Sequence, residues 1–200
     1  MKSRTLSHLL LASLLLLLAL SACSSSDSEP AGSSPAKEGV KTAARQNQAF
    51  DSCSLLTAAD IHEFFPGASI EITKHGSEVS QESLGSRVCF YELSKDDMVF
   101  IQTIVYRTRD MNRDLQEAGR TAESNYLASK EYADGRIQVE GLGKDAYYGG
   151  SGLRAFSGLH VLVDRDTALN VSVGLGRGNQ DDQAHLKIEK ALAQKMISRL

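Results

Sequence analysis

Apolar positions in residues 51–200 change their spacing along the chain, and each change predicts a different kind of element. Residues 88–93 and 98–106 are rich in β-branched and aromatic side chains, and the polar residues 94–97 predict a hairpin turn between them. Both alternating faces of residues 100–106 are largely apolar, which predicts a strand inside a sheet. Short strands are also predicted at 69–73, 137–139, 146–148, 153–156, 159–163 and 168–173. The stretch 73–87 is otherwise expected to be a loop.

The last two of these strands are predicted to form a hairpin through the turn at 164–166. In the second of them, apolar residues alternate with Asn170 and Ser172, which predicts one buried face and one polar face. His160 alternates with apolar neighbours in the first, so we expect it on the outer face of its strand. The glycine-rich segment 149–152 predicts another turn.

Three segments have the three- and four-residue spacing of helices. Thr57 can cap the first helix, Asp60 suits its dipole, and Pro66-Gly67 predicts its end. Its apolar side is Ile61, Phe64 and Phe65, with Leu56 placed to pack on Ile61. A second helix is predicted from Asp110, with one apolar stripe of Met111, Leu115, Ala118, Ala122 and Tyr126. A third is predicted from about residue 181, with Ile188, Leu192 and Met196 on one side.

The predicted order is therefore helix, strands, helix, strands, helix. Short strand spacings and hairpin turns favour an antiparallel sheet, because a parallel βαβ fold would need a helix between most strands. The pattern predicts an α+β fold in which a single domain has an antiparallel sheet with helices packed on one face. About 150 residues, 51–200, suit one domain, and no internal repeat divides them.

The N-terminal segment has the layout of a secretion signal. Lys2 and Arg4 precede an almost wholly apolar run at 9–20, and Leu20-Ser21-Ala22-Cys23 resembles the lipobox of bacterial lipoproteins. The resemblance implies cleavage after residue 22 and attachment of lipid to Cys23. The alternative is an uncleaved transmembrane anchor, but the run is near the lower limit of about 20 residues for a span.

Residues 23–50 are expected to be a lipidated cysteine followed by a disordered tether, because they are rich in Ser, Ala, Glu and Gln and lack apolar periodicity. An alternative for residues 40–50 is docking on the domain. Removal of residues 1–22 takes away two basic residues and no acidic one, which changes the formal charge from −3 to −5. A mildly acidic chain is a poor nucleic-acid binder. We therefore expect membrane contact through the lipid.

Two cysteines remain in the domain, Cys53 and Cys89, in a chain that the signal directs out of the cytosol. A disulfide between them is the expected outcome. The alternatives are a redox pair or metal ligands, but no Cys-x-x-Cys is present and the histidines form no recognisable zinc spacing.

Three short motifs carry a further resemblance: Asp51-Ser52-Cys53-Ser54-Leu55-Leu56-Thr57, Cys89-Phe90-Tyr91 and Gly141-Leu142-Gly143-Lys144-Asp145-Ala146. They resemble a family of uncharacterised bacterial lipoprotein domains that open with Asp-x-Cys-x-Leu-Leu-Thr. The resemblance covers about residues 51–200 and implies a disulfide and a role in the cell envelope. It supplies no catalytic residue. The domain departs from the family pattern in having Cys-Phe-Tyr and no Trp.

Motifs for catalysis are incomplete. His62-Glu63 begins a zinc-protease motif, but Pro66 stands where the second histidine belongs, so we expect His62 at the surface. Asp164 and Asp166 lack the remaining calcium ligands. Gly176, Arg177 and Gly178 precede a helix and are a weak candidate for binding an anion. We assign no catalytic residue, no metal site and no cofactor.

The sequence is most consistent with a non-enzymatic envelope lipoprotein that binds a protein partner or a small ligand. Tyr147, Tyr148 and Phe156 are candidate contact residues, although core packing is the favoured explanation for them. The alternatives are an envelope hydrolase and an inhibitor or protective protein against an envelope-directed enzyme. Position 24 is Ser and not the aspartate that retains many lipoproteins at the inner membrane, which favours the outer membrane in a cell that has two.

Overall fold

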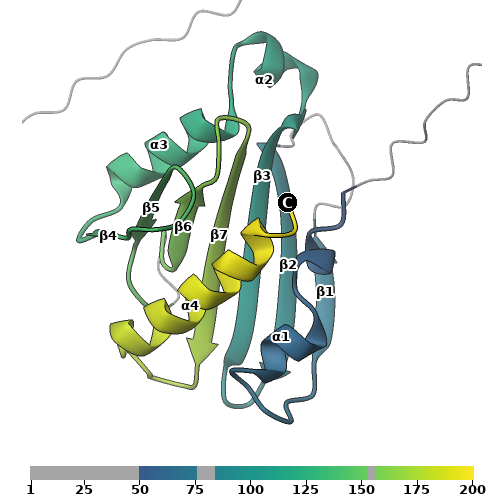
Figure 1. Ribbon diagram of the computed structural model, residues 1–200, viewed down its shortest axis with the longest axis vertical. Coiled ribbons are helices and arrows are strands. Elements are labelled where there is room, and N and C mark those ends of the chain that lie inside the picture. The colour runs from purple at the N-terminus through teal and green to yellow at the C-terminus, as the bar shows by residue number, and fades with distance from the viewer. Residues whose placement is uncertain (1–49, 76–83, 153–155) are drawn as a thin grey trace, which may run out of the picture. The chain divides into compact units, whose positions relative to one another are not determined.

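The computed structural model describes residues 50–75, 84–152 and 156–200, which belong to one compact unit, Gln46–Leu200. Seven strands form one antiparallel sheet in the order β1-β2-β3-β7-β6-β5-β4 (Figure 1). Their bounds are β1 Glu71–His75, β2 Leu84–Ser94, β3 Val99–Met111, β4 Ile137–Gln138, β5 Asp145–Tyr148, β6 Leu159–Leu162 and β7 Thr167–Leu175. With the helices, this sheet confirms the α+β class.

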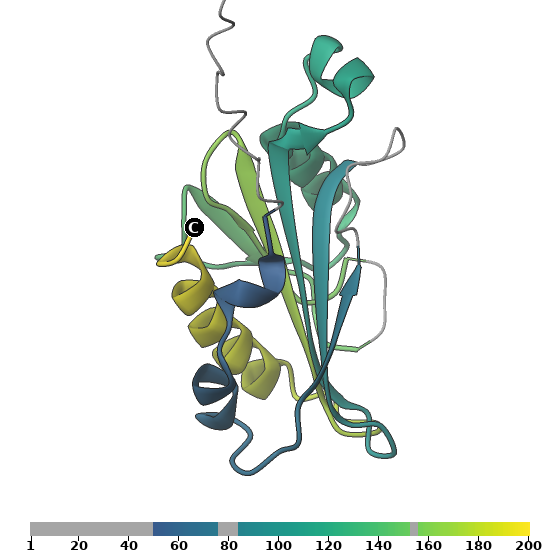
Figure 2. The same cartoon turned by 90° about the vertical axis from the view of Figure 1, so that its right-hand side faces the viewer.

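Helical segments lie on both faces of the sheet. They are η1 Ser52–Leu55, α1 Ala58–His62, α2 Arg113–Glu117, α3 Ala122–Tyr132 and α4 Asp182–Ile197. Figure 2 shows α1 and α4 on one side, which we call the α4 face, and α3 on the other, the α3 face. The prediction of helices on one face therefore holds for α1 and α4, whereas α3 differs from it. The difference arises because Tyr126 packs with Tyr147 and Ala168, which point away from α4.

The main hydrophobic core lies between the sheet and α4. Residues at alternate positions of the two middle strands, such as Ile101 of β3 and Val171 of β7, are fully buried there. Leu192 and Met196 of α4 pack in the same cluster, as the sequence predicts, and Ile188 is partly buried. None of the helices in the described residues is long and apolar enough to cross a bilayer.

The β2–β3 hairpin is confirmed, and β3 lies inside the sheet between β2 and β7. The hairpin is longer than predicted because β2 begins at Leu84, so the last part of the expected loop is strand. The hairpin turn before β7 is also present. Of the strand predicted at 153–156, residues 153–155 lie outside the described part, and Phe156 belongs to no strand.

The first helix starts where the sequence predicts. Thr57 Oγ1 accepts a hydrogen bond from the Asp60 amide at 3.2 Å, and Asp60 Oδ2 accepts one from the Thr57 amide at 2.8 Å. This reciprocal pair is a capping box, which satisfies two amides that a helix start leaves unpaired.

The single helix predicted from residue 110 is wrong. Met111 still belongs to β3, and the helical stretch that follows is divided into α2 and α3. Gly119 has a φ of 74°, the left-handed conformation that ends helices, and Thr121 caps a new helix. The apolar stripe therefore joins residues of three different elements.

Candidate functional site

The candidate site is a pocket of about 400 Å³ on the α3 face, which we call the α3 pocket. Its floor is made by β3 and β7. Because side chains alternate along a strand, Gln102, Ile104 and Tyr106 point to this face while Ile101 and Val105 point to the core. Asn170 and Ser172 of β7 complete the floor.

One wall of the α3 pocket is the inner side of α3, which contributes Asn125, Tyr126, Ala128 and Ser129. The start of this helix is tied to β3, because the Ala122 amide donates to Thr108 Oγ1 at 3.0 Å. The wall therefore has a defined position on the sheet.

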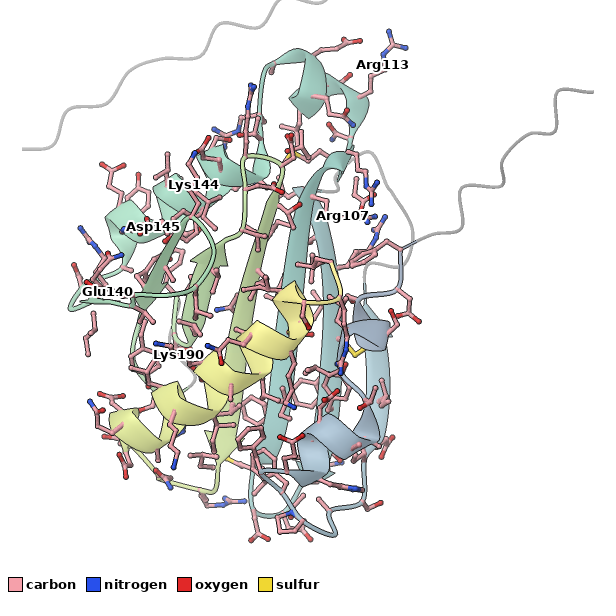
Figure 3. All side chains as sticks on the ribbon, viewed as in Figure 1. Arg107, Arg113, Glu140, Lys144, Asp145 and Lys190 are labelled. Atoms are coloured by element: carbon pink, nitrogen blue, oxygen red, sulfur yellow. A yellow bond between two sulfur atoms is a disulfide. The ribbon has the colours of Figure 1, made fainter. Side chains whose placement is uncertain are left out.

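Two ion pairs connect α3 to β5 and to the residue before it. Lys144 lies 2.7 Å from Glu123, and Lys130 lies 2.6 Å from Asp145. Lys144 and Asp145 are labelled beside α3 in Figure 3. Lys130 holds the pKa of Asp145 below its usual range even though burial acts in the opposite direction. These charges serve to attach the helix and do not line the pocket.

The other wall comes from Phe156 and Ser157, which precede β6. His160 Nε2 lies 3.1 Å from the Phe156 carbonyl oxygen. The side-chain amide of Asn170 donates to the carbonyls of Ser157 and Leu159, each at 3.3 Å. These contacts hold the wall against the sheet. Phe156 has a φ of 62°, an unfavourable conformation for a bulky residue, and its side chain is 38 % exposed at the rim.

His160 is the ionisable imidazole in this pocket. Burial lowers the pKa of His160 to about 4, although the carbonyls of Phe156 and Ser157 act in the opposite direction. The ring is therefore neutral near pH 7. Because a carbonyl can only accept, Nε2 carries the proton in this arrangement, and Nδ1 is left as a hydrogen-bond acceptor.

The described residues that line the α3 pocket include no Asp, Glu, Lys or Arg. Its polar side chains are amides, hydroxyls and a neutral imidazole: Gln102, Asn125, Ser129, Ser157, His160, Asn170 and Ser172. The remaining walls are apolar or aromatic. Such a lining can hydrogen-bond a neutral ligand and bury its apolar surface, but it offers an ion no opposite charge.

The predicted disulfide is confirmed. Cys53 of η1 is joined to Cys89 of β2, with a Cα–Cα distance of 5.2 Å. Tyr91, two residues further along β2, donates its hydroxyl to the Cys53 carbonyl at 3.1 Å. The bond pins the start of the domain to the α4 face of the sheet. Cys23 lies outside the described residues.

The weak anion candidate lies in the exposed connection between β7 and α4. Arg177 donates to the Asp96 carbonyl at 3.0 Å, which ties this loop to the β2–β3 turn. Gly176 and Gly178 both have positive φ angles. Anion binding here stays a prediction. Within the described residues, no group of His, Cys, Asp and Glu is placed to hold a metal ion.

Two of the three candidate contact aromatics are core residues. Tyr147 and Tyr148 are fully buried, on opposite faces of β5, and burial raises the pKa of each phenol. The Tyr148 hydroxyl donates to Asp182 at 3.0 Å. Phe156 is the partly exposed member and lines the α3 pocket. His62 is exposed, as expected from the sequence.

The sequence patterns did not reveal this pocket. Alternation predicts a polar face for Asn170 and Ser172 and an outer face for His160, but it does not predict that α3 and Phe156 cover this side of the sheet. The available signal was the register of the 164–166 hairpin, which places His160 directly opposite Asn170. Comparison with known proteins gives no further guidance, since no family model, curated protein or solved structure matches this chain.

Proposed function

We propose that this protein is a membrane-anchored binding module of the cell envelope whose ligand occupies the α3 pocket. The observation that carries the proposal is the pocket itself. Its volume of about 400 Å³ lies in the usual range for small-molecule sites, about 300–1,000 Å³, and several polar groups converge in it.

A binding role is supported over catalysis by the state of His160. Its protonated nitrogen contacts a backbone carbonyl, and its low pKa makes it a weak base. Within the described residues, the ring contacts the carbonyls of Phe156 and Ser157 and stacks on Tyr147, and these contacts hold it in place.

The proposed location of the module is inferred from the N-terminal sequence. A lipid on Cys23 would anchor the chain on the non-cytoplasmic side of a bacterial membrane, in keeping with the lipobox-like residues. The mildly acidic composition makes a nucleic-acid ligand a poor fit. In a cell with two membranes, Ser24 favours the outer one.

The test uses tryptophan to fill the pocket. The acylated protein is purified from its own membranes as wild type, Ala128→Trp and Leu127→Trp, and bound small molecules are extracted and compared by mass spectrometry. Ala128 lines the pocket, whereas Leu127 is the next residue on the same helix and is 52 % exposed. Circular dichroism checks that all three proteins are folded.

We expect a class of small molecules that accompanies wild type and Leu127→Trp and is reduced at least tenfold in Ala128→Trp. Ser129→Trp, which fills the same pocket from the neighbouring position, should give the same loss. Identical extracts from all the folded proteins would overturn the proposal.

A further inference from the structure

We propose that the α3 pocket takes an uncharged amphiphile, a ligand with an apolar body and a hydroxyl- or amide-type head group. This inference rests on the proposed function and names the chemical class of the ligand. It is carried by the order of side chains along the pocket floor and by the absence of charge among the described lining residues.

The floor changes from apolar to polar along the strands. Tyr106 is opposite Ala168, Ile104 is opposite Asn170, and Gln102 is opposite Ser172. Tyr126 of α3 packs at the apolar end, in the cluster that contains Ala168 and Tyr106. A ligand lying along β3 and β7 therefore meets mainly aromatic and aliphatic side chains at one end and amide and hydroxyl side chains at the other.

Several polar side chains of the pocket have donors and acceptors that are available to a ligand. The side chains of Gln102 and Ser172 make no hydrogen bond within the described residues, and the same holds for Asn125 and Ser129 on the wall. Amides and hydroxyls both donate and accept, as do the head groups of alcohols and amides. His160 of β6, which lies opposite Asn170, adds an acceptor nitrogen.

Ions are disfavoured because none of the described residues that line the pocket carries a compensating charge. The nearby charges are already paired with one another, Lys130 with Asp145 and Lys144 with Glu123, and none of the four lines the pocket. A carboxylate or ammonium head would lose hydration without gaining an opposite charge. A neutral head group loses less hydration free energy, and the side-chain amides of the pocket can form hydrogen bonds with it.

The length of the floor sets the size of the ligand. From Tyr106 to Gln102 the strand advances four residues, about 13 Å. This distance is close to the length of an eight-carbon chain with a small head group. Octyl compounds that differ only in the head are therefore suitable probes.

The experiment measures displacement of the neutral fluorophore N-phenyl-1-naphthylamine from acylated protein in nanodiscs at pH 7.5. The competitors are 1-octanol, octanoate and octyltrimethylammonium. Ala128→Trp in identical nanodiscs provides the blank for partition into lipid. We expect 1-octanol to displace the fluorophore from wild type at least tenfold more effectively than either ion.

Gln102→Glu supplies a second, independent readout. It places a carboxylate at the polar end of the pocket without a change in size, so octyltrimethylammonium should become the best competitor. Octanoate or octyltrimethylammonium matching 1-octanol on wild type would overturn the neutral-ligand inference and leave the proposed function standing. Equal fluorescence with wild type and Ala128→Trp would overturn both.

Discussion

The imidazole of His160 lies flat on the phenol ring of Tyr147, with centroids 4.5 Å apart and planes 5° apart. Tyr147 is fully buried and also packs against Tyr126 of α3, with their centroids 5.5 Å apart. The three rings thus connect the floor of the α3 pocket to its helical wall. The protonation state of His160 is therefore expected to affect both ligand binding and the stability of the domain.

We expect stability to fall in mild acid because of His160. Its pKa is lowered from 6.5 to about 4 on folding, so the unfolded chain binds a proton first as pH falls. The stabilisation is complete above pH 6.5 and is lost as pH falls toward 4. Between pH 7.5 and 5 the loss should be about 2 kcal/mol. Urea unfolding of wild type and His160→Gln measures it, and parallel pH profiles of the two would contradict it.

Glu189 should have the opposite pH dependence. It is buried in α4 and accepts a hydrogen bond from the Val173 amide at 2.9 Å, while burial raises its pKa well above 4.5. The stability associated with its protonated form is present below pH 4.5 and is lost as pH rises through the folded-state pKa. Glu189→Gln mimics the neutral acid. Its stability relative to wild type should increase from pH 4.5 to pH 8, and a constant difference would refute this assignment.

Loss of the Asp60–Arg199 pair should destabilise the domain. Arg199 donates to both oxygens of Asp60, at 2.6 and 3.1 Å, and holds the pKa of Asp60 well below its usual range. Asp60 is buried and also caps α1, whereas the Arg199 side chain is 36 % exposed, so Asp60→Asn should cost about 2 kcal/mol in urea unfolding.

Glu63→Gln is the matched control for Asp60→Asn. Glu63 also contacts Lys195, at 2.8 Å, but its side chain is 56 % exposed. The cost of removing this charge should be below about 1 kcal/mol. Equal effects of the two substitutions would contradict the larger contribution expected from the Asp60–Arg199 pair.

Removal of the Cys53–Cys89 disulfide should lower the free energy of unfolding by about 3–4 kcal/mol, because the bond closes a loop with a sequence separation of 36. Urea unfolding of Cys53→Ala/Cys89→Ala tests this. A reducing agent should destabilise wild type and leave the double variant unchanged. Mass spectrometry that found two free thiols in the exported protein would contradict the bond itself.

Cys23→Ala should abolish labelling with palmitate and release the protein from the membrane. The domain should remain folded, because the hydrophobic core of the described residues and the Cys53–Cys89 bond are formed within residues 50–200. Palmitate labelling and cell fractionation measure the first effect, and circular dichroism measures the second. Equal labelling of the variant and wild type would rule out the proposed lipid attachment.

Patterns over a few residues were sufficient for much of the fold. The cap at Thr57, the β2–β3 hairpin and the buried stripe of α4 depend on side chains close together in the sequence. The single helix predicted across residues 111–126 is wrong because the apolar spacing continues through the turn that separates α2 from α3. Gly119 and Thr121 predict the boundary better than periodicity does, since Gly119 adopts a left-handed conformation that ends a helix and Thr121 caps the next one.

The residues of the candidate site could be predicted only in part, because local sequence patterns do not show what covers a strand. Alternation is enough to place Asn170 and His160 on the polar side of their strands, because successive side chains of a strand point to opposite faces of the sheet. It does not place Gln102, since both faces of residues 100–106 are largely apolar. Whether that side meets water, a helix or a ligand depends on contacts between residues far apart in the chain. The packing of α3 and Phe156 over β3, β6 and β7 makes this polar face a pocket, and only the folded chain brings those segments together.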